Sequence, residues 1–181
     1  MKSQISKNHV CFYHRVLAIA LFCMAVVNIN AQETTMQELL GQSLAKLEQP
    51  TPEAYLNCIA ELKRIDMMYP DSIQPKYQMA LQSLCYAVTN PHADQVEAVL
   101  AETEQTITQM KGMKKADQSD ICTLTGFLYM VRIVQDPVKN GQRYYLDVMQ
   151  NYEKALKLNP DNQLAKQLQQ QFYEGMRKAG Y

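Results

Sequence analysis

The chain has 181 residues, of which 47% are apolar and 20% are charged, and its 18 Lys and Arg side chains balance 18 Asp and Glu. This composition is typical of one globular domain and excludes collagen-like, low-complexity and grossly disordered chains. The balanced charge also argues against a nucleic-acid partner, because a phosphate backbone selects proteins with an excess of Lys and Arg.

The first 31 residues have the pattern of a secretory signal peptide. Three basic side chains precede twelve consecutive apolar residues at 16–27, and small Ala31 offers a cleavage site. As a helix, twelve residues reach about 18 Å, well short of the roughly 30 Å hydrocarbon core of a membrane. We therefore expect a signal peptide at 1–31, cleavage after Ala31, and export to the periplasm or out of the cell. One mature domain at 32–181 would remain, without membrane insertion.

Cleavage would leave a mildly acidic chain with three cysteines. Residues 32–181 hold 15 basic and 18 acidic side chains, together with Cys58, Cys85 and Cys122. Because Cys is among the most buried residue types, we interpret these three as packed on helix faces, and a disulfide between two of them stays an open alternative. There is no Cys-x-x-Cys pair, so neither thiol redox catalysis nor a zinc knuckle is predicted.

Apolar residues recur every three or four positions along the mature chain, and this spacing predicts helices and no strands. Thr51-Pro52 has the cap and first-turn proline of a helix start, and Pro70 ends that helix. We interpret Asn90-Pro91 as a second start of this kind. The predicted helices cover about 35–47, 51–69, 72–88, the stretch after Asn90-Pro91 to 110, 119–134, 143–158 and 161–178.

Two of these predicted helices have further features. The helix at 119–134 is apolar on nearly all sides, so we expect it to be the most buried element. Asn140-Gly141 is interpreted as a break before the helix that starts at about Arg143. Because short connections force neighbouring helices to be antiparallel, the expected fold is all-α, with stacked antiparallel helical hairpins.

Residues 144–162 carry a repeat-like pattern. Tyr152, Ala155 and Pro160 provide an aromatic, an alanine and a terminal proline on one helix, and Tyr69-Pro70 repeats the junction. In this pattern the chain resembles tetratricopeptide-repeat secreted bacterial proteins. The resemblance implies an α-α superhelix of about seven helices, whose concave surface binds a protein or peptide.

Small residues at two positions fit the same interpretation. Ala80 and Gly126 could be the points where paired helices approach closely, since a small side chain lets two backbones come near. Pro70 and Pro160 are 90 residues apart, which is not a multiple of the roughly 34-residue repeat, so longer helices or insertions are expected between them.

No pattern in the sequence predicts a catalytic, cofactor or metal site. His92 is the one histidine of 32–181 and is interpreted as structural or exposed. Ser43 and Lys46 match the Ser-x-x-Lys string of penicillin-binding enzymes, but the accompanying Ser-Asp-Asn and Lys-Thr-Gly strings are missing. Glutamates of the fourth predicted helix fall between its apolar positions, on what we interpret as a solvated face. We expect no enzymatic activity and no cofactor.

Tyrosines and arginines at or near helix ends are the candidate partner-binding residues, because these side chains often anchor protein interfaces. The candidates are Tyr77, Tyr129, Arg132, Arg143 and Tyr144. The alternative is that they pack locally or form a salt bridge with Asp136 or Asp147. The predicted function is a non-enzymatic protein- or peptide-binding scaffold of the bacterial cell envelope. The alternative is a helical small-ligand-binding protein or enzyme with a pocket between helices.

Overall fold

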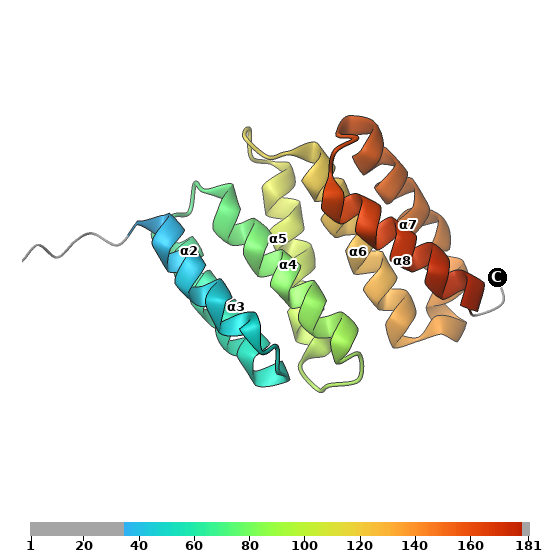
Figure 1. Cartoon of the computed structure of the whole chain (residues 1–181), viewed down its shortest axis with the longest axis horizontal. Coiled ribbons are helices and arrows are strands. Elements are labelled where there is room, and N and C mark those ends of the chain that lie inside the picture. The colour runs from blue at the N-terminus through green and yellow to red at the C-terminus, as the bar shows by residue number, and fades with distance from the viewer. Residues whose placement is uncertain (1–34, 179–181) are drawn as a thin grey trace, which may run out of the picture. The chain divides into compact units, whose positions relative to one another are not determined.

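The computed structural model in Figure 1 describes residues 35–178. In this part of the chain 83% of the residues are helical and none forms a strand. The predicted all-α fold is therefore confirmed. The predicted signal peptide and its cleavage site lie outside the described residues.

Seven α-helices follow one another in the described part of the chain. They are α2 (Met36–Ala45), α3 (Pro52–Met68), α4 (Ile73–Thr89), α5 (Val96–Lys111), α6 (Gln118–Gln135), α7 (Pro137–Leu158) and α8 (Gln163–Lys178), with a short 3-10 turn, η1 (Lys46–Glu48), after α2. Each helix packs against the next one in the chain (Figure 1). In addition, α4 packs on α6 and α6 on α8, whereas no comparable contact joins α3 to α5 or α5 to α7 among these helices.

The predicted start and end signals of α3 are confirmed. The Thr51 hydroxyl accepts a hydrogen bond from the backbone N–H of Ala54 at 3.1 Å, and Pro52 is the first helical residue. The helix ends at Met68, since the residue before Pro70 is pushed out of the helical region.

The predicted role of Asn90-Pro91 is wrong, because α5 begins only at Val96. The Asn90 side chain instead donates through Nδ2 to the carbonyl of Tyr86, at 2.9 Å, near the end of α4. The backbone N–H of Asn90 donates to the same carbonyl at 3.0 Å, so Asn90 belongs to the end of α4 and not to the start of α5.

The predicted break at Asn140-Gly141 is also wrong. Helix α7 starts six residues earlier than expected, at Pro137, and runs through both residues. The carboxylate of Asp136 caps this helix by accepting from the N–H of Lys139 at 3.0 Å. Asn140 finds a partner outside its own helix, because its Nδ2 donates to the carbonyl of Arg132 at 2.6 Å. That bond ties the start of α7 to the end of α6.

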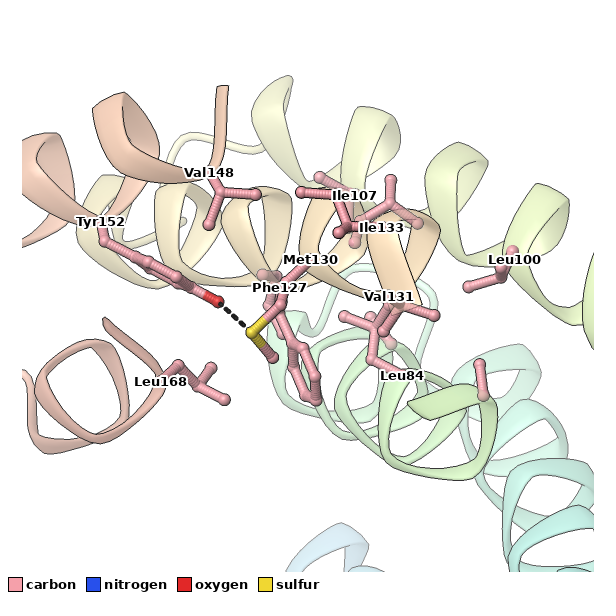
Figure 2. Close-up of a cluster of buried hydrophobic side chains, with 14 of the residues drawn as sticks. Leu84, Leu100, Ile107, Phe127, Met130, Val131, Ile133, Val148, Tyr152 and Leu168 are labelled. Carbon is pink, nitrogen blue, oxygen red and sulfur yellow. Dashed lines mark hydrogen bonds between the residues drawn. The ribbon is translucent and has the colours of Figure 1, made fainter. Parts of the chain in front are cut away.

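Helix α6 lies at the centre of the core, as predicted. It packs against α4, α5, α7 and α8, and its side chains are buried along nearly its whole length. Figure 2 shows Phe127, Met130 and Val131 of this helix among side chains from the helices around it. None of the helices in the described region is long and apolar enough to cross a membrane.

Gly126 allows α6 and α7 to approach closely. A Cβ atom at this position would lie 2.8 Å from Cε1 and 3.0 Å from Cδ1 of the Tyr152 ring, closer than real Cβ atoms come. The Tyr152 ring is fully buried, and its hydroxyl donates to Met130 Sδ at 3.8 Å (Figure 2). The prediction of a close helix contact at Gly126 is confirmed, and Ala80, the other small residue, is fully buried.

A buried polar cluster joins α6, α7 and α8. Asn162 Nδ2 donates to Ser119 Oγ at 2.9 Å and to Asp120 Oδ1 at 3.0 Å, and its Oδ1 accepts from the N–H of Ala165 at 3.0 Å. Ser119 Oγ donates in turn to the carbonyl of Ala155 at 2.8 Å. Asn162 therefore caps the start of α8 and holds it against the other two helices.

The cysteines of the described region are free thiols. Cys58 and Cys122 are buried and Cys85 is half-buried, so the interpretation as packed helix residues agrees with the structure and the disulfide alternative does not. Burial, together with the nearby Glu61 carboxylate, raises the pKa of the Cys58 thiol to about 11. The thiol is therefore protonated and weakly nucleophilic at neutral pH.

Candidate binding clefts

An open cleft between α5, α6 and α7 brings together four of the five predicted partner-binding residues. Both α5 and α7 pack on α6 but not on each other, so the C-terminal half of α6 forms the floor of a cleft of about 670 Å³. Tyr129 and Arg132 come from α6, and Arg143 and Tyr144 come from α7. We call the space around these four residues the Tyr-Arg cleft.

The aromatic side chains of the Tyr-Arg cleft are stacked. The ring centroids of Tyr129 and Tyr144 lie 5.2 Å apart with an interplanar angle of 16°, and the Arg143 guanidinium lies 4.9 Å from the centroid of Tyr144. Such contacts hold flat side chains in place. Within residues 35–178 Arg143 forms no ion pair, so its guanidinium can donate to a ligand.

Arg132 is held by a carboxylate from another helix. Its Nη1 donates to Glu97 Oε2 at 2.7 Å and Oε1 at 2.9 Å, and Gln135 Nε2 also donates to Glu97 Oε1 at 2.9 Å. The alternative of a local salt bridge with Asp136 is wrong for Arg132, because Asp136 caps α7 and α5 supplies the partner instead. This pair joins the α5 wall of the cleft to its floor.

The pKa of Glu97 depends on its hydrogen bonds with Arg132 and Gln135. Its pKa is lowered, mainly by the hydrogen bond from Arg132 and further by the one from Gln135. An acid whose folded-state pKa is lowered adds stability above its unfolded pKa, and that stability is lost as the pH falls through the folded value. The Glu97 carboxylate is largely exposed to solvent, so the contribution of the pair to stability should stay below about 1 kcal/mol.

We expect Arg132→Gln to raise the pKa of Glu97 towards its ordinary value of about 4.3. Carboxyl chemical shifts followed by NMR through a pH titration measure this change. Glu61 on α3, whose pKa is lowered mainly by the hydrogen bond from Lys46, is the control and should titrate as in the parent chain. Equal Glu97 titration in both proteins would show that the Arg132 pair does not form.

The rest of the Tyr-Arg cleft carries charges of both signs. Lys139, Glu104 and the exposed His92 line it together with the four named residues. Burial, and then the charges of Asp147 and Glu104, raise the pKa of Tyr129, so this phenol stays protonated and can donate a hydrogen bond. The cleft therefore offers aromatic surface, a guanidinium that can donate, and acceptors within one site.

Tyr77, the fifth candidate, lies apart from the other four. It is half-buried in a separate cleft of about 550 Å³ between α2, α4 and the start of α6. Burial, and then the Asp120 and Asp117 carboxylates, raise its pKa to about 12. The sequence contained no signal for this separation, because it depends on which helix faces meet.

Ser43 and Lys46 have a structural role. Ser43 is buried, and both side chains hydrogen-bond to the Glu61 carboxylate on α3. They therefore tie α2 and its following turn to the next helix. Among the residues that the structure describes, no group of His, Cys, Asp and Glu is placed to hold a metal ion.

Sequence reasoning missed an apolar groove of about 570 Å³ between α6, α7 and α8. We call this space the apolar groove. Its lining residues are Met130, Ile133, Val134, Pro137, Gly141, Gln142, Tyr145, Leu146, Gln171, Phe172, Gly175 and Met176. A signal was present, since Leu146 is apolar yet does not lie on the side of the sixth predicted helix that carries Val148 and Tyr152.

No family model matches this sequence, and no curated protein or solved structure is similar enough to count as a match. The class of protein is therefore defined by its own structure. It is an all-α protein of successive helices packed against one another, with clefts bounded by three or more of these helices.

Proposed function

We propose that the chain is a non-enzymatic scaffold that binds a protein or peptide segment in the Tyr-Arg cleft. The observation that carries this proposal is the stack of Tyr129 on Tyr144, with the Arg143 guanidinium over the second ring. Aromatic and Arg side chains that are already ordered lose little conformational freedom on binding, which is the property of residues that dominate interface energies.

The chemistry of the cleft indicates the kind of segment it would take. An apolar or aromatic side chain would lie against the tyrosines, and an acidic side chain beside it would accept hydrogen bonds from Arg143. Arg132 is occupied by Glu97, so it shapes the floor and is a weaker contact for a partner.

Two features support a repeat-like scaffold. The first helix of one hairpin packs on the first helix of the next, α4 on α6 and α6 on α8, as in stacked helical repeats. Helix α8 buries Ala165, Leu168 and Phe172 and so extends the same stack. The same proposal includes the tetratricopeptide-like class, cleavage after Ala31 and a place in the cell envelope.

The alternative function, small-ligand binding between helices, is supported by the apolar groove. Its volume and mainly apolar lining match those of ordinary ligand sites. The Tyr-Arg cleft and the apolar groove share no lining residue, so the two functions can be tested separately.

Peptides selected from a random display library on the purified chain test the main proposal. We expect Tyr129→Ala and Arg143→Ala each to weaken a selected peptide by about 10-fold to 100-fold, as is usual for anchor residues. Isothermal titration calorimetry gives the dissociation constants.

Tyr173→Ala and Arg177→Ala are the matched controls. They remove the same side-chain types from the exposed face of α8 and should leave peptide affinity unchanged. The peptide-binding proposal fails if selection enriches no peptide, or if the cleft variants bind the selected peptides as tightly as the controls do.

A further inference from the structure

We propose that the Tyr-Arg cleft binds a peptide segment that carries an acidic and a basic side chain on either side of an apolar residue. This inference rests on the proposed function and narrows the class of partner for the same site. Three observations carry it: free basic side chains near one end of the cleft, a free acidic side chain near the other, and the tyrosine stack between them.

Two basic side chains lie near one end of the cleft. Lys139 and Arg143 are four residues apart on α7, so they lie on the same face of this helix, and both line the cleft. Neither forms an ion pair within residues 35–178. The charge of Lys139 contributes to the lowered pKa of Glu97, so this end of the cleft is the one that contains the Arg132–Glu97 pair.

The carboxylates at this end already have partners. Glu97 accepts hydrogen bonds from Arg132 and Gln135, and Asp136 accepts from the backbone N–H of Lys139 as the cap of α7. The positive end of the α7 dipole offsets the charge of Asp136. This end of the cleft therefore keeps free cationic donors, which can bind an acidic side chain of a partner.

The other end of the cleft is acidic. Glu104 lines it from α5, is exposed, and forms no ion pair in the described part of the chain. Burial, and then the charges of Asp147 and Glu104, raise the pKa of Tyr129, so both carboxylates act near this ring. A basic side chain of a partner would be attracted to this end.

The spacing of the two ends suits a short extended segment. Glu104 lies seven residues after Glu97 on α5, so the ends are about 10 Å apart along this helix. The Arg143 guanidinium lies over the Tyr144 ring, and Glu104 acts on the other ring of the stack, so aromatic surface lies between the opposite charges. An extended segment rises about 3.3 Å per residue. An acid and a base about three residues apart, with an apolar side chain between them, therefore match the cleft.

Display selection on the full chain, followed by calorimetric titration at low salt, tests this inference. We expect the selected peptides to carry an acidic and a basic residue about three positions apart, with an apolar or aromatic residue between them. Low salt is used because ions screen exposed charge pairs. Glu104→Lys and Lys139→Glu should each weaken a selected peptide at least about 3-fold, because attraction becomes repulsion.

Charge reversal in the peptide distinguishes a direct pair from a structural effect. A selected peptide whose basic residue is replaced with Glu should bind Glu104→Lys more tightly than the parent chain. One whose acidic residue is replaced with Lys should likewise prefer Lys139→Glu.

Glu153→Lys and Lys157→Glu are the matched controls for these variants. They make the same charge changes at a surface hollow of α7 that shares no residue with the Tyr-Arg cleft, and they should leave every peptide affinity unchanged. Circular dichroism confirms that all four variants fold.

Three results would overturn this inference: selected peptides without the paired charges, cleft variants that bind like the controls, or reversed peptides that do not prefer the reversed variants. In each case peptide binding itself still stands if Tyr129→Ala weakens the selected peptides. Selection that enriches no peptide would overturn both proposals.

Discussion

Replacement of Asn162 with Ala is expected to lower the free energy of unfolding by about 2 to 4 kcal/mol. The change removes the side-chain cap of α8 and also leaves Asp120 without its donor and Ser119 without one of its partners. Loss of a cap alone typically costs about 1 kcal/mol, and each buried group left without a partner adds about 1 to 3 kcal/mol. Urea denaturation followed by circular dichroism measures the difference.

The loss of stability in Asn162→Ala should depend on pH, because Asn162 donates a hydrogen bond to the Asp120 carboxylate. Burial, and then the charge of Asp117, raise the pKa of this acid, while the hydrogen bond from Asn162 lowers it. An acid with a raised folded-state pKa destabilises the fold once the pH rises above its unfolded value. Without Asn162 the pKa of Asp120 should rise further, so the destabilisation should be larger at pH 7 than at pH 3.

Asn57→Ala is the matched control for this experiment. Asn57 is exposed on α3, and its replacement should change stability by less than about 0.5 kcal/mol. If Asn162→Ala proves as mild as Asn57→Ala, the polar cluster does not hold α8 in place.

The second large effect is expected at Gly126. In a helix, Gly→Ala normally stabilises by up to about 1 kcal/mol, because Ala has the higher helix propensity. At Gly126 the added methyl group would lie 2.8 Å from Tyr152 Cε1 and 3.3 Å from Asn151 Cβ. The Tyr152 ring is fully buried and cannot move aside without disturbing the core around it. We therefore expect Gly126→Ala to destabilise by about 1 to 3 kcal/mol.

Gly41→Ala is the control that separates the effect of helix propensity from the steric clash with Tyr152. Gly41 lies inside α2, and a methyl group added there would meet no neighbouring atom within 4 Å, so only helix propensity should act at this position. Thermal unfolding should show a higher midpoint for Gly41→Ala and a lower one for Gly126→Ala. A rise in both midpoints would contradict the close approach of α6 and α7.

Local signals were enough to predict most helices and the class of fold. Thr51-Pro52 and Pro70 bound α3 as expected, because capping and proline effects act within a few residues. The predicted helix boundaries were wrong where an Asn side chain bonds to a group other than the one that its local sequence suggests. Asn140 bonds to Arg132, eight residues earlier, and Asn90 bonds back to α4, so neither marks the boundary that its local sequence suggests.

The candidate binding residues were chosen because they are Tyr and Arg near helix ends, and the sequence did not predict which of them lie together. Arg132 pairs with Glu97, which is 35 residues away in the chain, and no local pattern indicates that partner. Tyr77 was grouped with Tyr129 and Tyr144 on the basis of residue type, yet the fold places it in another cleft.

Periodicity, caps and prolines are properties of neighbouring residues, and they alone lead to an all-α chain whose most buried helix is α6. The positions of the clefts depend instead on contacts between residues far apart in the chain. Because α5 and α7 pack on α6 and not on each other, four candidate side chains share one cleft. Because two glycines of α7 and α8 face the same space, an apolar groove lies between these helices and α6.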